Sequence, residues 1–144
     1  MIRLAVKDDL EGLLRLYEHL HNNPFPEMSK TLCELWEKII NDESHSIIVA
    51  EEDEKIVSSC VLVIILNLTH GQKPYALVEN VVTHKDYRNR GLASACLDFA
   101  KKKACESGCY KIMLMTGSKE ESTLNFYRRA GYNCEDKTAF IMWL

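Results

Sequence analysis

A strand-like run that leads through a basic loop into a glycine and a helical pattern is the feature that most constrains this fold. Residues 75–83 are rich in β-branched and apolar side chains, and residues 92–104 repeat small and apolar side chains at helical spacing. Gly91 stands at the junction, and lysines 101–103 lie where positive charge favours the end of a helix. A short apolar run follows at residues 110–115. The order predicts a βαβ unit and therefore an α/β fold.

The flanking segments extend this unit into a larger sheet. Two amphipathic patterns before it predict helices, and three β-rich runs before it predict strands, of which two form an antiparallel hairpin around a polar turn at residues 51–54. A further helix and two closing strands come after it. The expected order is β-α-α-β-β-β-α-β-α-β-β, a mixed, mostly antiparallel sheet of about seven strands flanked by about four helices. The ranges outside the central unit are strands 2–5, 46–50, 56–66, 132–135 and 139–144 and helices 8–20, 29–40 and 118–129.

Length and charge narrow the class of protein. The 144 residues, of which 47% are apolar, suffice for one core, so residues 1–144 are expected to form a single domain. The net charge of −3 offers no basic field for nucleic acid. The longest apolar run, residues 56–68, is interrupted by polar side chains and is too short to span a bilayer, and residues 1–9 are too charged for a secretory signal. We expect a soluble, cytoplasmic protein with neither a membrane nor a nucleic-acid partner.

Six cysteines are scattered through the chain and mostly lie within apolar patterns, as buried free thiols do. Cys105 and Cys109 are one helical turn apart, but no Cys-x-x-Cys pair and no nearby histidine pair accompanies them. The sequence therefore predicts reduced thiols and no metal site.

The loop before the central helix has the composition of an anion-binding site. The first N–H groups of a helix have no partners within it, and the helix dipole adds partial positive charge there. Gly91 and the small Ala93 allow a phosphate to approach the backbone, while Lys85, Arg88 and Arg90 gather positive charge in an acidic chain. An ordinary loop ending in a capping glycine would have the same spacing. A nucleotide-binding loop is disfavoured because no Lys-Ser/Thr ending follows the glycine.

Arg88-x-x-Gly91-x-Ala93, placed between a strand and a helix, resembles the Arg/Gln-x-x-Gly-x-Gly/Ala motif of the GNAT N-acetyltransferase superfamily. Residues 2–9, 82–88 and 125–132 are similar to landmarks of that family in the same order, so the resemblance covers nearly the whole chain. It implies the GNAT fold, with splayed fourth and fifth strands that hold the pantetheine of acetyl-CoA, and a pyrophosphate on the amides of residues 89–94. It also implies a bulge near Val81 whose free N–H polarises the thioester carbonyl.

The cofactor-binding residues that this resemblance implies come from the end of the fourth strand, the loop, the start of the helix and a late helix. They are Val81, Val82, Thr83, Arg88, Asn89, Arg90, Gly91, Leu92, Ala93, Ser94 and Asn125.

Within the superfamily, the segments 79–82, 108–112 and 126–127 are similar to parts of glucosamine 6-phosphate N-acetyltransferases. Two positions depart from that pattern. Met115 stands where those enzymes carry an Asp, and Thr123 where they carry an Asn. These departures leave the amino-sugar substrate open.

Three residues are candidates for proton transfer. Glu79 lies inside an apolar strand, where a carboxylate is costly unless it is paired or faces a wet cavity, so it is either a general base or an ion-paired residue on an exposed sheet face. The resemblance gives Tyr127 a functional hydroxyl that protonates the departing CoA sulfur, whereas as a helix residue its ring could only pack against the sheet. His84 follows the strand and is either a proton shuttle near neutral pH or a surface residue.

These observations predict an enzyme that transfers acetyl from acetyl-CoA to a primary amine of a small molecule by direct attack in a ternary complex. The rival hypothesis is a non-catalytic acyl-CoA sensor or interaction domain, which Met115 and Thr123 favour because two expected polar groups are missing. The resemblance is also compatible with a homodimer.

Overall fold

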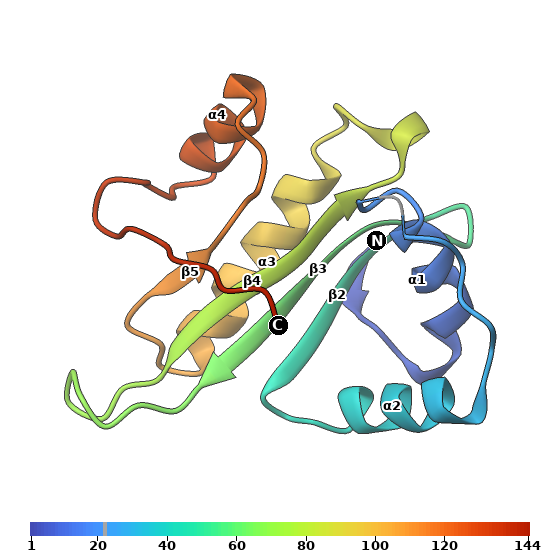
Figure 1. Ribbon diagram of the computed structural model, residues 1–144, viewed down its shortest axis with the longest axis horizontal. Helices are drawn as coiled ribbons and strands as arrows, with labels where there is room; N and C mark the ends of the chain where they lie inside the picture. The colour runs from blue at the N-terminus through green and yellow to red at the C-terminus, as the bar shows by residue number, and fades with distance from the viewer. Residues whose placement is uncertain (22) are drawn as a thin grey trace.

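A computed structural model describes residues 1–21 and 23–144, and Figure 1 shows a twisted sheet with helices on both faces. The five strands lie in the order of the sequence, and every pairing is antiparallel except that of the last two. They are β1 (Ile2–Leu4), β2 (His45–Glu52), β3 (Lys55–Ile65), β4 (Tyr75–Thr83) and β5 (Ile112–Leu114).

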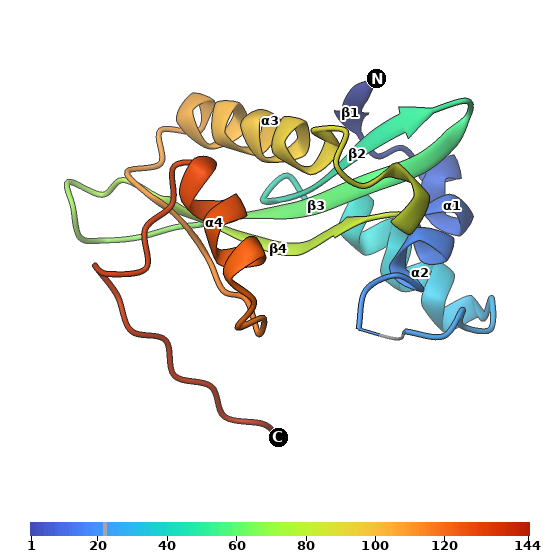
Figure 2. The same ribbon diagram turned by 90° about the horizontal axis from the view of Figure 1, so that it is seen from above.

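Two apolar clusters fill the two faces of the sheet. On one face Ile48, Leu62 and Val78 pack with Leu97 and Ala100 of the central helix. The opposite face is covered by the first two helices, as Figure 2 shows. Since successive side chains of a strand point to opposite faces, the nearly unbroken apolar runs of β2 and β3 supply both clusters. The helices are α1 (Leu10–Tyr17), α2 (Lys30–Ile40), α3 (Leu92–Glu106) and α4 (Glu121–Arg129), with short 3-10 turns η1 (Lys7–Asp9) and η2 (Lys85–Tyr87).

Polar contacts fix the first half of the chain on the sheet. The Arg3 guanidinium donates to Asp9 at 2.6 and 2.9 Å and to Glu51 at 2.9 and 2.6 Å, which joins β1, η1 and β2. Ser29 caps α2 by accepting the Leu32 N–H at 3.1 Å, and the buried Trp36 of that helix donates its indole N–H to the Lys7 carbonyl at 2.9 Å. These bonds hold α1 and α2 against one face.

The pairing between the fourth and fifth strands, which were expected to splay apart, is short. The parallel ladder of β4 and β5 begins at Ala76 and Ile112 and ends at Val78 and Leu114. Beyond that point β4 continues to Thr83 while the chain after β5 turns away towards α4 (Figure 1). Towards the carboxyl end of β4 the two segments therefore no longer pair.

The sequence prediction of about four helices is confirmed, but that of about seven strands is wrong. Residues 132–135 and 139–144 were expected to be strands, and the structure gives them no strand pairing. Their β-branched and aromatic side chains favour extended backbone, but a strand also needs a neighbour to pair with. In Figure 2 this part of the chain leads away from the sheet, so it has no neighbour there. In the part of the chain that the structure describes, no helix has the length and apolar character needed to cross a membrane.

Candidate functional site

The start of α3 has the backbone geometry of an anion site. Gly91 is the N-cap in the left-handed conformation, with φ 77° and ψ 4°, and Asn89 is also left-handed, with φ 61°. Ala95 is the first residue whose N–H reaches a helical acceptor, the Gly91 carbonyl at 3.0 Å. The amides of Leu92, Ala93 and Ser94 precede it and have no acceptor within the helix. A Cβ at Gly91 would meet no atom within 4 Å, so this end of the helix is open.

The two arginines of the loop differ in their surroundings. Arg88 makes one long contact, from Nε to the Thr83 carbonyl at 3.4 Å, and has no carboxylate partner in the described chain. Arg90 donates to the Asp86 carbonyl at 3.1 Å, lies 3.5 Å from the Glu52 carboxylate and stacks over an aromatic ring of η2. Arg88 is therefore the freer cation beside the helix start, while the charge of Arg90 is shared with Glu52.

The fourth strand bulges where the sequence resemblance places a bulge. Ser59 of β3 pairs with Val82, whereas Val61 pairs with Glu79, so Cys60 alone stands opposite two residues of β4. Asn80 takes the strained left-handed conformation there, with φ 50°. An extra residue in one strand leaves a backbone group outside the ladder. The bulge lies in the carboxyl half of β4, where β4 and β5 no longer pair.

Hydrogen bonds from β3 hold the end of β4, just before the loop that leads to α3. The buried Ser58 hydroxyl donates to the Val82 carbonyl at 2.9 Å and lies 2.8 Å from the Thr83 hydroxyl. The predicted site residues Val82 and Thr83 are thus bonded to β3 just ahead of η2 and the α3 start.

Glu79 and Tyr127 come from different elements but share one electrostatic environment. Burial is the main cause that raises the pKa of the Tyr127 hydroxyl above its usual value, and the electrostatic influence of Cys60 and Glu79 adds to it. Glu79 is half-buried on β4 and has no hydrogen bond or ion pair with any residue that the structure describes. The alternative of an ion-paired surface residue therefore has no partner for Glu79 among the described residues.

The remaining candidates lie at the edges of the site. Asn125 is the least suited to a ligand, because its amide oxygen accepts a hydrogen bond from Arg128 one turn along α4, at 3.0 Å. His84 accepts the Asp86 N–H at 3.2 Å, and its ring lies 4.2 Å from that of His19, centroid to centroid. Met115 follows β5 and is 56% exposed.

Sequence reasoning missed a polar cluster on the opposite face of the bulge. Ser59 is completely buried, and its hydroxyl has no hydrogen-bond partner in the described chain. Burial raises the pKa of Tyr17 on α1 to about 12, against the opposing influence of the nearby Ser59 and Asn80 side chains. Tyr17 and Asn80 line a cavity of about 340 Å³ together with Leu14, Leu20, Asn23, Pro24 and Pro26. The available signal was a serine in the middle of an apolar strand.

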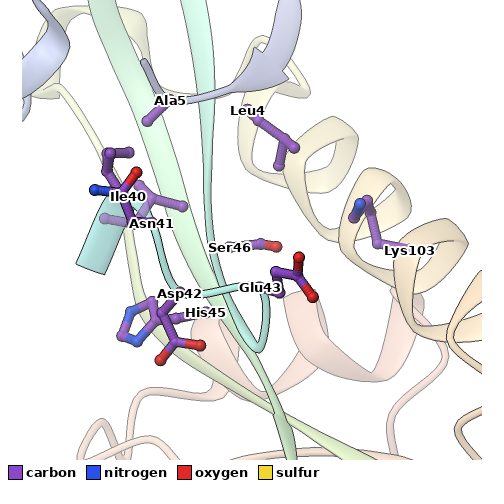
Figure 3. A pocket seen from close by; sticks show the side chains of 10 residues that line it. Leu4, Ala5, Ile40, Asn41, Asp42, Glu43, His45, Ser46 and Lys103 are labelled. Carbon is purple, nitrogen blue, oxygen red and sulfur yellow. The ribbon is translucent and has the colours of Figure 1, made fainter. Parts of the chain in front are cut away.

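A second cavity, of about 300 Å³, lies elsewhere and contains none of the predicted site residues. Figure 3 shows its lining from β1, the connection between α2 and β2, and Lys103 of α3. Among the described residues no group of three or more His, Cys, Asp or Glu side chains is arranged to hold a metal ion.

The model of the acetyltransferase (GNAT) family matches residues 4–132. The chain belongs to this family. An acetyltransferase of Yersinia pestis is 29% identical over 138 residues, which are 94% of this chain and 89% of that protein. A solved structure from Agrobacterium tumefaciens strain C58, assigned to the acetyltransferases, is 33% identical, covers 100% of this chain and 99% of that chain, and has a TM-score of 0.93.

The glucosamine-6-phosphate N-acetyltransferase of Arabidopsis thaliana has the same fold, with a TM-score of 0.86 over 99% of this chain and 97% of that chain. It is only 20% identical, so the likeness to amino-sugar enzymes extends to the fold alone. This chain is thus an N-acetyltransferase with the GNAT fold, as the sequence predicts.

Proposed function

We propose that this N-acetyltransferase moves the acetyl group of acetyl-CoA to a primary amine of a small molecule, by direct attack in a ternary complex. One observation carries the proposal. The open N-terminus of α3 and the β4 bulge both lie at the carboxyl end of β4, past the point where β4 and β5 stop pairing, and Glu79 of β4 contributes to the raised pKa of Tyr127. Anion binding, a backbone donor and proton-transfer groups are the elements that acyl transfer from a thioester needs.

Features of the described backbone support a site for acetyl-CoA. The amides of residues 89–94 would hold the pyrophosphate, aided by the unpaired charge of Arg88, because a helix start with two left-handed residues presents N–H groups to an anion. Pantetheine carries two amide groups, so it can bond to strand groups that β4 and β5 leave unpaired beyond Val78 and Leu114.

The acceptor would approach from the face that carries α1 and α2. Its cavity opens beside Tyr17 and Asn80, on the other side of the bulge from α3, and it is small and partly polar. Such a cavity suits a small molecule with a hydroxyl or amide beside its amine, because Tyr17 and Asn80 each offer donors and acceptors.

In the reaction, the amine nitrogen attacks the thioester carbonyl carbon while the Val81 N–H donates to the developing oxyanion. A preorganised donor of this kind contributes on the order of 3 kcal/mol. Glu79, directly or through water, takes the proton that the amine loses. The C–S bond then breaks, Tyr127 protonates the departing sulfur, and the products are the N-acetylated amine and free CoA.

The test supplies acetyl-CoA with a panel of small amines, amino sugars, polyamines and peptides. Amine-dependent release of free thiol, with the acetylated product seen by mass spectrometry, would support the proposal. Tight CoA binding in calorimetry without turnover on any amine would instead favour the acyl-CoA sensor. Turnover on peptides alone would contradict the small-molecule acceptor.

A further inference from the structure

The cavity of about 300 Å³ in Figure 3 combines apolar walls with charged side chains. Its apolar lining comes from around the end of β1, the end of α2 and β2, and consists of Leu4, Ala5, Ile40 and Ile47. Pockets of this size, with apolar walls and a few polar groups, hold small molecules. At about 1.5 Å per residue the start of α3 lies roughly 17 Å along the helix from Lys103, which lines the cavity. The cavity is therefore a separate place from the proposed reaction site.

Two opposite charges reach this cavity from different elements. Lys103 is half-buried on α3, and Glu43 belongs to the connection between α2 and β2. In Figure 3 the amine of Lys103 is directed from α3 towards β2, and the carboxylate of Glu43 is directed towards α3. Neither group forms an ion pair with any residue that the structure describes. Both charges are thus available to a ligand.

The end of α2 adds negative potential on the Glu43 side of the cavity. The last carbonyl groups of a helix lack partners within it, and the helix dipole gives them partial negative charge. Asp42 follows this end, and hydrogen bonds from the Ser44 hydroxyl and N–H hold the pKa of its carboxyl below the usual value. In Figure 3 the ring of His45 points away from Glu43. This side of the cavity therefore favours an ammonium group.

We infer that this cavity binds an aliphatic α-amino acid, with its ammonium group at Glu43, its carboxylate at Lys103 and its side chain against the apolar walls. A ligand that carries both charges pairs with both groups, whereas a simple amine leaves Lys103 without a partner and a simple carboxylate leaves Glu43 without one. The apolar walls favour an aliphatic side chain, because a polar one would be buried there without hydrogen bonds. The site is independent of the proposed reaction.

Calorimetric titration of the full chain with L-leucine tests this site. N-acetyl-L-leucine lacks the ammonium group and isopentylamine lacks the carboxylate, so each should bind at least roughly tenfold more weakly than L-leucine through the loss of one charged contact. Amide NMR shifts on addition of L-leucine should be confined to residues 40–47 and the C-terminal half of α3. Failure of L-leucine to bind would overturn the inference, as would equal affinity for the three compounds.

Two variants that each remove one charge have matched controls. Lys103→Met and Glu43→Gln should each weaken L-leucine binding roughly tenfold. Lys101→Met and Glu54→Gln remove the same charges at exposed positions outside the cavity and should leave the affinity unchanged. Wild-type affinity in both cavity variants would overturn the inference. Loss of L-leucine binding in Tyr17→Phe would overturn it too, because leucine would then occupy the proposed acceptor cavity, while acetyl transfer itself is measured separately by thiol release.

Discussion

Gly91 and Gly108 stand at the two ends of α3 in the same left-handed conformation, with φ of 77° and 74°. A Cβ at either position would meet no protein atom within 4 Å. The two glycines therefore impose the same backbone penalty on any larger residue, and they differ in what lies beside them. Free helix amides adjoin Gly91, while the closing turn of the helix adjoins Gly108.

Gly91→Val should weaken acetyl-CoA binding by at least tenfold, about 1.4 kcal/mol, because a branched side chain would occupy the space that the pyrophosphate needs. Gly108→Val is the control, since the left-handed conformation costs a side chain about 1 to 2 kcal/mol at either end. Calorimetric titration with acetyl-CoA and a thermal melt of both variants make the comparison. If a folded Gly91→Val protein bound acetyl-CoA with wild-type affinity, the pyrophosphate would not bind at this site.

Tyr127→Phe should lower turnover roughly 10²- to 10⁴-fold with little change in acetyl-CoA affinity, because it removes the proposed acid and keeps the ring. Tyr132→Phe is matched, since Tyr132 packs against Tyr127, with ring centroids 6.4 Å apart, and burial likewise raises its pKa, to about 12. Steady-state kinetics on both variants should show a loss only at Tyr127. Equal rates for the two would make Tyr127 a packing residue.

The pH profile of the same reaction follows from the direction of the Tyr127 shift. A tyrosine acts as an acid only while protonated, and a raised pKa extends that state beyond the usual value of 10. The rate should therefore not fall between pH 7 and pH 10 through loss of this proton. A fall near pH 8 that Tyr127→Phe abolishes would contradict the assignment.

Glu79→Gln should lower the rate most at neutral pH, where the amine most needs a base.

Asp9→Asn should destabilise the fold by about 1 to 2 kcal/mol at neutral pH, because it breaks the paired hydrogen bonds from Arg3. Burial alone would raise the pKa of Asp9, but the bonds from Arg3 and from the Val6 N–H lower it below the usual 3.8. A lowered pKa means that the stabilisation is present above about pH 4 and is lost as the pH falls through the folded value. Urea unfolding at pH 7 and pH 3 measures this difference, with the exposed Asp8→Asn as the control.

Tyr17→Phe should raise the KM for the acceptor amine several-fold, the loss of about one hydrogen bond, and leave acetyl-CoA affinity unchanged. The reason is that Tyr17 lines the cavity on the α1 face, away from the α3 start. Kinetics with each substrate varied separately would show the split. An increase confined to the KM for acetyl-CoA would show that the cavity does not bind the acceptor amine.

The central βαβ unit was predictable because local signals specify it. The limits of the expected strand 75–83 coincide with β4, and α3 starts directly after Gly91. Even the bulge near Val81 followed from family resemblance. In these segments the periodicity, the glycine and the charged helix end all favour one structure.

The features that were missed depend on residues distant in sequence. Residues 139–144 have the composition of a strand, but whether they pair depends on where the turn held by the Asn133 amide oxygen directs them. The Ser59, Tyr17 and Asn80 cluster exists only because α1 packs across the bulge. Likewise, Arg90 in the loop pairs with Glu52 of β2, which lies far earlier in the sequence. The spacing of apolar residues along the chain does not reveal such a contact.

A longer ladder between β4 and β5 would raise the stability of the fold and lower its activity. Pairing stops at Val78 and Leu114, so the sheet gives up interstrand bonds that a longer β5 would supply. A substitution that extended this ladder would raise the melting temperature and at the same time fill the space that we propose for the cosubstrate. Selection for thermal stability alone should thus yield variants that are better folded and slower.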